Sequence, residues 1–340
     1  MCFLRLDAET ADRIMSTHFL ITIDVEGDNV WAHPERVSTE NAGHLSAFQA
    51  LCETYGLRPT YLTNHEMATS QVYRDFASDV VRRNVGEVGM HLHAWDSPPD
   101  EPLTAEDYRH APYLIDYPEA TLRRKVRYMT DLLESTFQTK MVSHRAGRWA
   151  MNATYAQALV ECGYLADCSV TPHVSWRNTP GAPSGSGGTD YSKAPEKPYF
   201  IDLSDVTREG ESNLLEIPMT IVTNDSPIRR ISHAVSSRCG SFARAAVNRV
   251  LPSIQWMRPN GRNVKSMLQI MHRKRAEGAI HVEFMIHSSE LMPGGSPTFR
   301  TRESIDKLYA DMEHVFAATQ GLIPSTVAEF RAAFTGGTAH

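Results

Sequence analysis

Cysteine is scarce in this sequence of 340 residues. The five cysteines are odd in number, form no C-x-x-C pair and are too sparse for a disulfide scaffold. This usage excludes a small disulfide-stabilised fold and favours a reducing compartment. The five are Cys2, Cys52, Cys162, Cys168 and Cys239.

Long apolar runs are also lacking. No stretch reaches the roughly 20 apolar residues of a membrane span. Residues 1–17 alternate charged with apolar side chains, whereas a secretory signal needs an uninterrupted apolar core. We therefore expect a cytoplasmic protein without a membrane span. Residues 1–17 are expected to be an N-terminal extension, and Met15 lies so close to the first apolar run that Met1 and Met15 are both candidate starts.

No long block of basic residues is present. Lys and Arg total 34 against 40 Asp and Glu, which gives a net charge of −6, so nucleic acid is not an expected partner. With 41% hydrophobic residues the chain can bury a full core, yet it is long for one compact domain and short for two. We expect one domain over residues 18–335, carrying insertions; the oligomeric state stays open.

What the sequence does contain is a regular alternation of short apolar runs and amphipathic segments. Such repeated units predict a parallel α/β architecture and favour a barrel. The expected strands are His18–Asp24, Pro59–Leu62, Glu87–His93, Lys140–His144, Tyr164–Cys168, Leu214–Ile221 and Ile280–His287. The expected helices are 39–55, Val72–Arg83, Leu122–Phe137, Ala153–Cys162, Val264–Ala276 and Glu303–Thr319, with a short one after Ser325.

Two segments interrupt this alternation and are expected to be insertions. Residues 171–200 are rich in proline and include the run Ser184-Gly-Ser-Gly-Gly188, which predicts a long surface loop. Residues 225–262 contain a basic, partly helical stretch from about Arg229 to Val250.

Polar residues gather where the expected strands end. In parallel α/β folds the carboxyl ends of the strands are where active sites are built. The residues in question are Asp24, Glu26, His91, His93, His144, Arg145 and His287.

The segment Met90-His-Leu-His-Ala94 places two histidines two residues apart. On an extended chain both imidazoles face the same side, roughly 6 to 7 Å apart at their backbones, so both can reach one ion. Two imidazoles and a carboxylate are a common ligand set for zinc or another divalent metal. The alternative is a pair of hydrogen-bonded core or loop histidines, and the acidic pair on another strand end favours the metal.

The acidic pair is Asp24 and Glu26, which face one side if the strand stays extended. One carboxylate can hold a metal while the other takes a proton from the attacking water. A solvated acidic turn is the alternative, because Asp28 and Asn29 follow and favour loops.

Other polar and aromatic residues lie near the same strand ends. His287 ends an apolar strand and is suited to donate a proton to a leaving group. Arg145 could hold a catalytic carboxylate or form a structural salt bridge, and Arg148 is similarly placed. Four tryptophans are core or rim residues or platforms for a sugar: Trp31, Trp95, Trp149 and Trp176.

The ordered motifs resemble those of the polysaccharide deacetylase (NodB-like) family. Thr22-Ile-Asp-Val-Glu-Gly27 resembles the first motif, which implies Asp24 as general base and Glu26 as metal ligand. Gly86-Glu-Val-Gly-Met-His-Leu-His93 resembles the second, which implies His91 as a ligand. The family's second histidine would fall at Trp95, so His93 takes its place.

The remaining motifs resemble the family's later ones. Arg145-Ala-Gly147 implies an arginine that steadies the catalytic acid, and Met285-Ile-His287 implies His287 as general acid with Met285 lining the pocket. The segment Tyr164–Ser169 is similar to a strand that supplies an aspartate behind the catalytic residues, here Asp167. Trp95 and Trp149 are further candidate substrate contacts.

The resemblance implies a distorted (β/α) barrel, often seven-stranded, and metal-dependent removal of N- or O-acyl groups from sugars, with Zn²⁺ as the expected ion. In the cytoplasm the substrates would be sugar precursors, which favours a role in surface polysaccharide assembly. Two alternatives remain: a C–N hydrolase of small amides, and a catalytically silent carbohydrate-binding protein.

Overall fold

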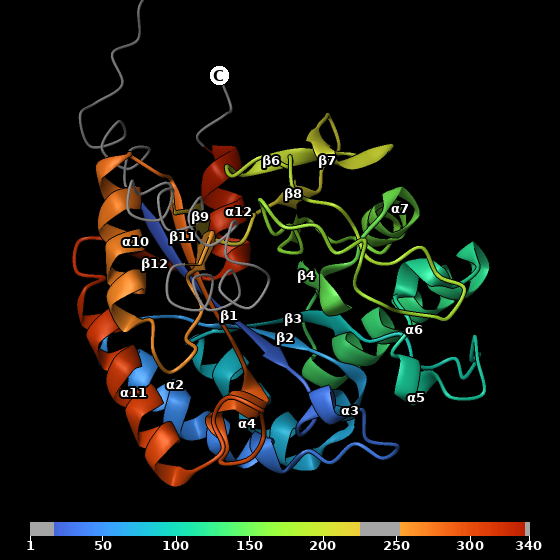
Figure 1. Ribbon diagram of the computed structural model, residues 1–340, viewed down its shortest axis with the longest axis horizontal. Helices are drawn as coiled ribbons and strands as arrows, with labels where there is room; N and C mark the ends of the chain where they lie inside the picture. The colour runs from blue at the N-terminus through green and yellow to red at the C-terminus, as the bar shows by residue number, and fades with distance from the viewer. Residues whose placement is uncertain (1–16, 225–251, 337–340) are drawn as a thin grey trace, which may run out of the picture.

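The computed structural model describes residues 17–224 and 252–336. Within them, seven strands pair side by side, all parallel, in a curled sheet in which β1 lies between β11 and β2 (Figure 1). Their order is β11 (His281–His287), β1 (His18–Val25), β2 (Thr60–Thr63), β3 (Glu87–Leu92), β4 (Ser143–Ala146), β5 (Ala166–Asp167) and β8 (Leu215–Glu216). The short β12 (Ile323–Ser325) also pairs with β1. The predicted distorted (β/α) barrel is confirmed.

Strand β1 forms from a run rich in apolar and β-branched residues. Every residue of β1 after His18 is buried, as a strand covered on both faces requires. Its register sets Asp24 beside His287 on β11, and the register of β3 with β4 sets His91 beside Arg145. Four polar residues that are distant in the sequence are thereby brought to one end of the sheet.

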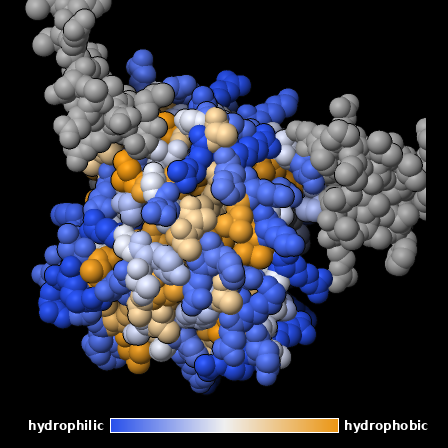
Figure 2. Space-filling model, turned by 90° about the vertical axis from the view of Figure 1, so that its left-hand side faces the viewer, coloured by the Kyte–Doolittle hydropathy of each residue, from blue (hydrophilic) through white to orange (hydrophobic). Residues whose placement is uncertain are grey.

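Helices flank the sheet, with α10 and α11 on one side and α6 and α7 on the other (Figure 1). Helix α6 buries residues at helical spacing, among them Leu122, Val126, Met129 and Leu133. Figure 2 views the α10 and α11 side, where hydrophilic side chains predominate with apolar ones between them. The helices are α2 (Leu45–Thr54), α3 (His65–Thr69), α4 (Gln71–Arg83), α5 (Asp107–His110), α6 (Glu119–Phe137), α7 (Ala153–Glu161), α10 (Val264–Ala276), α11 (Arg302–Ala317) and α12 (Val327–Gly336).

Five short 3₁₀ turns lie among the described loops. They are η1 (Val30–Ala32), η2 (Glu40–His44), η3 (Leu114–Asp116), η4 (Gly147–Trp149) and η5 (Ser288–Leu291). Three of them follow strands of the sheet or lie just beyond, so they build the rim at the carboxyl ends. No helix among the described residues is long and apolar enough to cross a membrane.

The predicted strand Leu214–Ile221 is wrong as a single element. It is divided into β8 and β9 (Ile221–Thr223) around Pro218, which has no N–H to donate to a neighbouring strand. Strand β9 turns away and pairs antiparallel with β10 (Ile254–Trp256). The hairpin of β6 (Tyr199–Asp202) and β7 (Asp205–Glu209) extends the sheet beyond β8 and was not predicted.

The first insertion has neither helix nor strand from 171 to 198, apart from a bridge between Ser175 and Asp190. It is not a detached surface loop, because Tyr191 is fully buried and donates a hydrogen bond to the carbonyl of Trp149 at 2.7 Å. The basic stretch from Arg229 to Val250 lies outside the described residues. Strand β4 begins at Ser143, so His144 and Arg145 lie within the strand and not after it.

Candidate functional site

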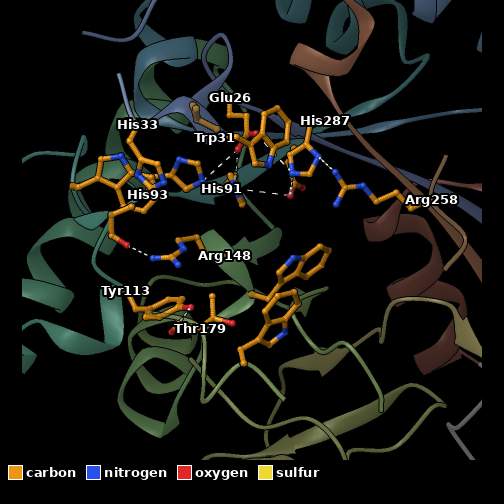
Figure 3. A pocket seen from close by; sticks show the side chains of 16 residues that line it. Glu26, Trp31, His33, His91, His93, Tyr113, Arg148, Thr179, Arg258 and His287 are labelled. Atoms are coloured by element: carbon orange, nitrogen blue, oxygen red, sulfur yellow. Dashed lines mark hydrogen bonds and ion pairs between the residues drawn. The ribbon is translucent and has the colours of Figure 1, made fainter. Parts of the chain in front are cut away.

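A cavity of about 310 Å³ opens at the carboxyl ends of the central strands (Figure 3). Asp24 and Glu26 reach it from the end of β1, His91 and His93 from the end of β3, and His287 from the end of β11. The wall is completed by aromatic and basic side chains, chiefly Trp31, Trp95, Tyr113, Arg148, Trp149, Trp176 and Arg258.

Three potential metal ligands meet in this cavity. Nε2 of His91 lies 3.0 Å from Nε2 of His93, and Oε2 of Glu26 lies 3.4 Å from Nε2 of His93 and 3.9 Å from Nε2 of His91. One atom of each residue falls within 4.8 Å of the others, and all three residues are buried. The two imidazoles face the same point, as the H-x-H spacing predicts.

The charge states of these groups suit a divalent cation. Burial lowers the pKa of His91 to about 4 and that of His93 well below its usual range, so both rings are neutral at pH 7. Nδ1 of His91 donates to the carbonyl of Arg145 at 2.9 Å, which leaves its Nε2 lone pair facing the cavity.

The carboxylate of Glu26 forms no ion pair with a lysine or arginine among the described residues. Burial, together with the negative charges of Asp24 and Glu66, raises the pKa of Glu26 well above its usual range, although the charge of Arg258 opposes this. Its Oε1 is buried and accepts no hydrogen bond from any described residue. A cation bound by Oε2 and both Nε2 atoms would offset the charge of this carboxylate, and an N₂O donor set suits Zn²⁺ with room for further ligands.

Asp24 is held differently, by an arginine buried inside the barrel. Nη1 of Arg145 donates to Oδ1 of Asp24 at 2.6 Å. Burial alone would raise the pKa of Asp24, but the positive charge and the hydrogen bond of Arg145 hold it well below its usual range. Asp24 is therefore ionised and fixed in orientation.

A second acid, which sequence reasoning missed, shares the same arginine. Nη2 of Arg145 donates to Glu283 and, at 2.7 Å, to the hydroxyl of Thr22. Burial raises the pKa of Glu283 to about 7 despite Arg145. Glu283 could have been predicted from the alternation of side chains along β11, because residues 283 and 287 lie on the same face of that strand.

His287 is held from behind by two residues of the rim. Its Nε2 points into the cavity, 3.8 Å from Oδ2 of Asp24 and 3.7 Å from Oε1 of Glu26. Its Nδ1 lies 2.9 Å from Nη2 of Arg258 and 3.3 Å from Oε2 of Glu290. Burial would raise the pKa of Glu290, but Arg258 lowers it to about 2. Sequence reasoning missed Arg258, which lies within the second insertion, residues 225–262.

Three predicted site residues do not line the cavity: Arg145, Asp167 and Met285. Asp167 is fully buried and pairs with Nδ1 of His144 at 2.5 Å, while its carboxylate also binds Ser169. It touches Arg145 only through its neighbours, since Nε of Arg145 donates to the carbonyl of Cys168 at 2.9 Å. Met285 is fully buried within β11 and does not line the cavity.

The tryptophans do line it. Trp95 stacks on His93 with ring centroids 4.4 Å apart and planes at 18°. Trp149 lies against the guanidinium of Arg145 at 4.9 Å, and Trp31 packs edge-on to His287 at 5.0 Å. Arg148 and Trp149 both have positive φ, 55° and 65°, an uncommon backbone for such residues that turns both side chains into the cavity.

Comparison with solved structures identifies the fold. A protein from Parabacteroides distasonis, provisionally described as a glycoside hydrolase/deacetylase, matches with a TM-score of 0.60 and 11% identity, over 95% of this chain and 72% of that one. A protein from Mycobacterium smegmatis, provisionally described as a polysaccharide deacetylase, matches with a TM-score of 0.54 and 13% identity, over 96% and 92%. The chain has the polysaccharide deacetylase fold.

The same fold occurs with another activity. The 4-alpha-glucanotransferase of Thermococcus litoralis matches with a TM-score of 0.51 and 10% identity, over 94% of this chain and 41% of that one. No family profile and no curated protein sequence matches the chain. Because a fold hosts more than one chemistry, the function has to be argued from the site itself.

Proposed function

We propose that this protein is a metal-dependent hydrolase that removes an N- or O-acetyl group from a sugar or polysaccharide precursor. The observation that carries the proposal is the meeting, in one cavity, of an N₂O donor set with an ionised, arginine-held aspartate and a histidine whose Nε2 lies 3.8 Å from that aspartate. Hydrolysis of an amide or ester needs these three functions: an activated water, a base and an acid.

Glu26, His91 and His93 would hold the cation, with Zn²⁺ as the proposed ion. When bound, it supplies Lewis acidity for the acyl oxygen and the attacking water. Asp24 is not needed as a ligand in this scheme. Held by Arg145 and ionised, it accepts the proton of the water as the water attacks the acyl carbon.

His287 is assigned the opposite proton transfer. Its Nε2 faces the cavity, so an N–H at that atom can donate to the departing amine or alkoxide oxygen. Arg258 donates to Nδ1, which leaves the ring proton of neutral His287 on Nε2. Glu290 lies at the same nitrogen and stabilises the ring when it is charged.

The cavity walls support a sugar as the substrate. The rings of Trp31, Trp95 and Trp149 provide flat apolar faces, and Arg148 and Arg258 provide hydrogen-bond donors beside them. This mixture of aromatic faces and a few polar groups is common in small-molecule sites. Acylated precursors of surface polysaccharides, met in a reducing compartment, remain our proposed substrates.

The proposal is tested by measuring acetate release from a panel of N- and O-acetylated sugars by the zinc-loaded protein. A parallel panel of small cyclic and linear amides identifies a C–N hydrolase of the alternative kind. We expect release from sugars that disappears in Asp24→Asn. Sugar binding without any release, unchanged in Asp24→Asn, would instead indicate a carbohydrate-binding protein and contradict the proposal.

A further inference from the structure

Two acidic side chains lie on the far side of His93 and have no part in the proposed reaction. They are Glu66, on α3, and Asp96, which follows β3. One potential ligand atom from each of Glu66, His93 and Asp96 falls within 4.8 Å of the other two. His93 therefore belongs to two groups, with Nε2 directed at Glu26 and His91, and Nδ1 directed at Asp96.

A buried nitrogen faces the two carboxyl groups without a partner. Nδ1 of His93 has no hydrogen-bond partner among residues 17–224 and 252–336. His93 is only 3% exposed and the side chain of Asp96 only 15%. A buried polar atom without a partner is costly, so this nitrogen, directed at two carboxyl groups, indicates a missing occupant.

The spacing fits an ion better than a direct hydrogen bond. Nδ1 of His93 lies 4.0 Å from Oδ2 of Asp96, beyond hydrogen-bond length. Two ligands that each lie about 2.1 Å from one cation are separated by about 3 to 4 Å. A proton shared between the two carboxylates could satisfy their oxygens, but it would leave Nδ1 of His93 without a partner.

Glu66 is also anchored as a ligand would be. Its Oε1 accepts hydrogen bonds from the backbone N–H of Gly27, at 2.8 Å, and from the side chain of Asn64. Asn64 in turn caps α3 by accepting from the N–H of Met67. The carboxylate is thus fixed through one oxygen while the other faces Asp96.

A small cavity of about 120 Å³ borders Asp96, and three more acids line it: Asp100, Glu101 and Asp107. Lys125 is the basic residue in its wall, and its Nζ is engaged with the carbonyls of Ser97 and Pro99. The excess of carboxylates favours entry of positive charge.

We propose that Glu66, Asp96 and Nδ1 of His93 form a second divalent-cation site that shares His93 with the first. Two carboxylate oxygens and one imidazole nitrogen suit Zn²⁺ or a similar transition ion. The second site depends on the proposed function only through the position of His93.

The test is a count of ions in the full-length protein. The metal-free protein is titrated with Zn²⁺ alone by calorimetry, and the zinc content of the loaded protein is measured by mass spectrometry. We expect two ions per chain in the unaltered protein and one in Glu66→Gln and in Asp96→Asn. These two variants are nearly isosteric, and the first can still accept from Gly27 and Asn64. Glu101→Gln, in the small cavity but outside the site, should retain two.

A further pair of variants separates this inference from the proposed function. Glu26→Gln should lose the first ion and keep the second, whereas His93→Ala should lose both. A single ion in the unaltered protein, lost in Glu26→Gln and unaffected by Glu66→Gln, overturns the second site and leaves the proposed function standing. Two ions per chain without acetate release from any acetylated sugar would overturn the proposed function and leave the second site standing.

Discussion

Nη1 of Arg145, on β4, lies 2.6 Å from Oδ1 of Asp24, on β1, in a position that is fully closed to solvent. The arginine reaches Asp24 across two intervening strands, β2 and β3, and binds Glu283 through its other terminal nitrogen. A single cation thus compensates two acids in the barrel interior. The arrangement links the stability of the barrel to the orientation of the proposed base.

Replacement of Arg145 should therefore affect stability as well as activity. In Arg145→Met the carboxylates of Asp24 and Glu283 lose their buried counter-ion, and we expect a loss of about 3–5 kcal/mol in the free energy of unfolding. Arg145→Lys, which keeps the charge, should lose less. Urea titration measures both, with Arg109→Met as the control because its ion pair with Glu106 is exposed. Equal stability of the Met variant and the unaltered protein would contradict this account.

Zinc should stabilise the folded protein. A ligand that binds only the native state adds about 2.7 kcal/mol at a concentration 100 times its Kd, so the melting temperature should rise with Zn²⁺ and fall again on chelation. Glu26→Gln should reduce the rise, since it removes a donor from the cavity. A rise that is the same in this variant and in the unaltered protein would place the stabilising ion elsewhere.

His287 should act on turnover without being needed for metal binding. General acid catalysis by a positioned side chain contributes about 10²- to 10⁴-fold, so His287→Gln should lower kcat by a factor in that range. Its zinc content should match that of the unaltered protein, because Glu26, His91 and His93 remain. Acetate release and metal analysis on the same preparation decide the matter, and a variant with normal kcat would exclude His287 as the acid.

A histidine outside the site should make stability depend on pH. Burial, with the nearby charges of Lys274 and His18, lowers the pKa of His281 to about 4, although its Nε2 donates to the carbonyl of Pro218. The unfolded chain binds this proton first, so His281 costs stability as pH falls from about 6.5 towards 4, by at most about 3 kcal/mol.

The matched variant for this effect is His281→Gln, which keeps a donor for Pro218 but does not titrate. Between pH 7 and pH 5 the free energy of unfolding should fall by less in the variant than in the unaltered protein. Identical pH dependence of the two proteins would show that His281 is not the group responsible.

The sequence predicted the central part of the fold because its signals there are local. The run ending at Asp24 is apolar except for the β-branched Thr22, and the 3.6-residue periodicity of residues 122–137 predicts the observed α6 with only its start displaced. The division of the strand around Pro218 was missed, although proline was the available signal. The β6 and β7 hairpin was missed because the proline-rich loop before it masks the change of pattern.

The site was predictable where it depends on strand ends and not where it depends on loops. The motif residues Asp24, His91 and His287 are delivered by strands whose register follows from the sheet. Arg258 and Glu290 reach His287 from the rim, and Glu66 meets Asp96 from a separate helix, so their positions follow from tertiary packing. Met285 was predicted from a motif but does not line the cavity, because a motif position inside a strand need not reach it.

The central claim, that Glu26, His91 and His93 hold a divalent cation, is tested most directly by a crystal structure of the zinc-loaded protein with anomalous data at the zinc absorption edge. The account predicts a strong anomalous peak between Oε2 of Glu26 and Nε2 of both histidines, at about 2.0–2.2 Å from each. Fully occupied crystals with no peak at that point, and with the two imidazoles hydrogen-bonded to each other instead, would contradict it.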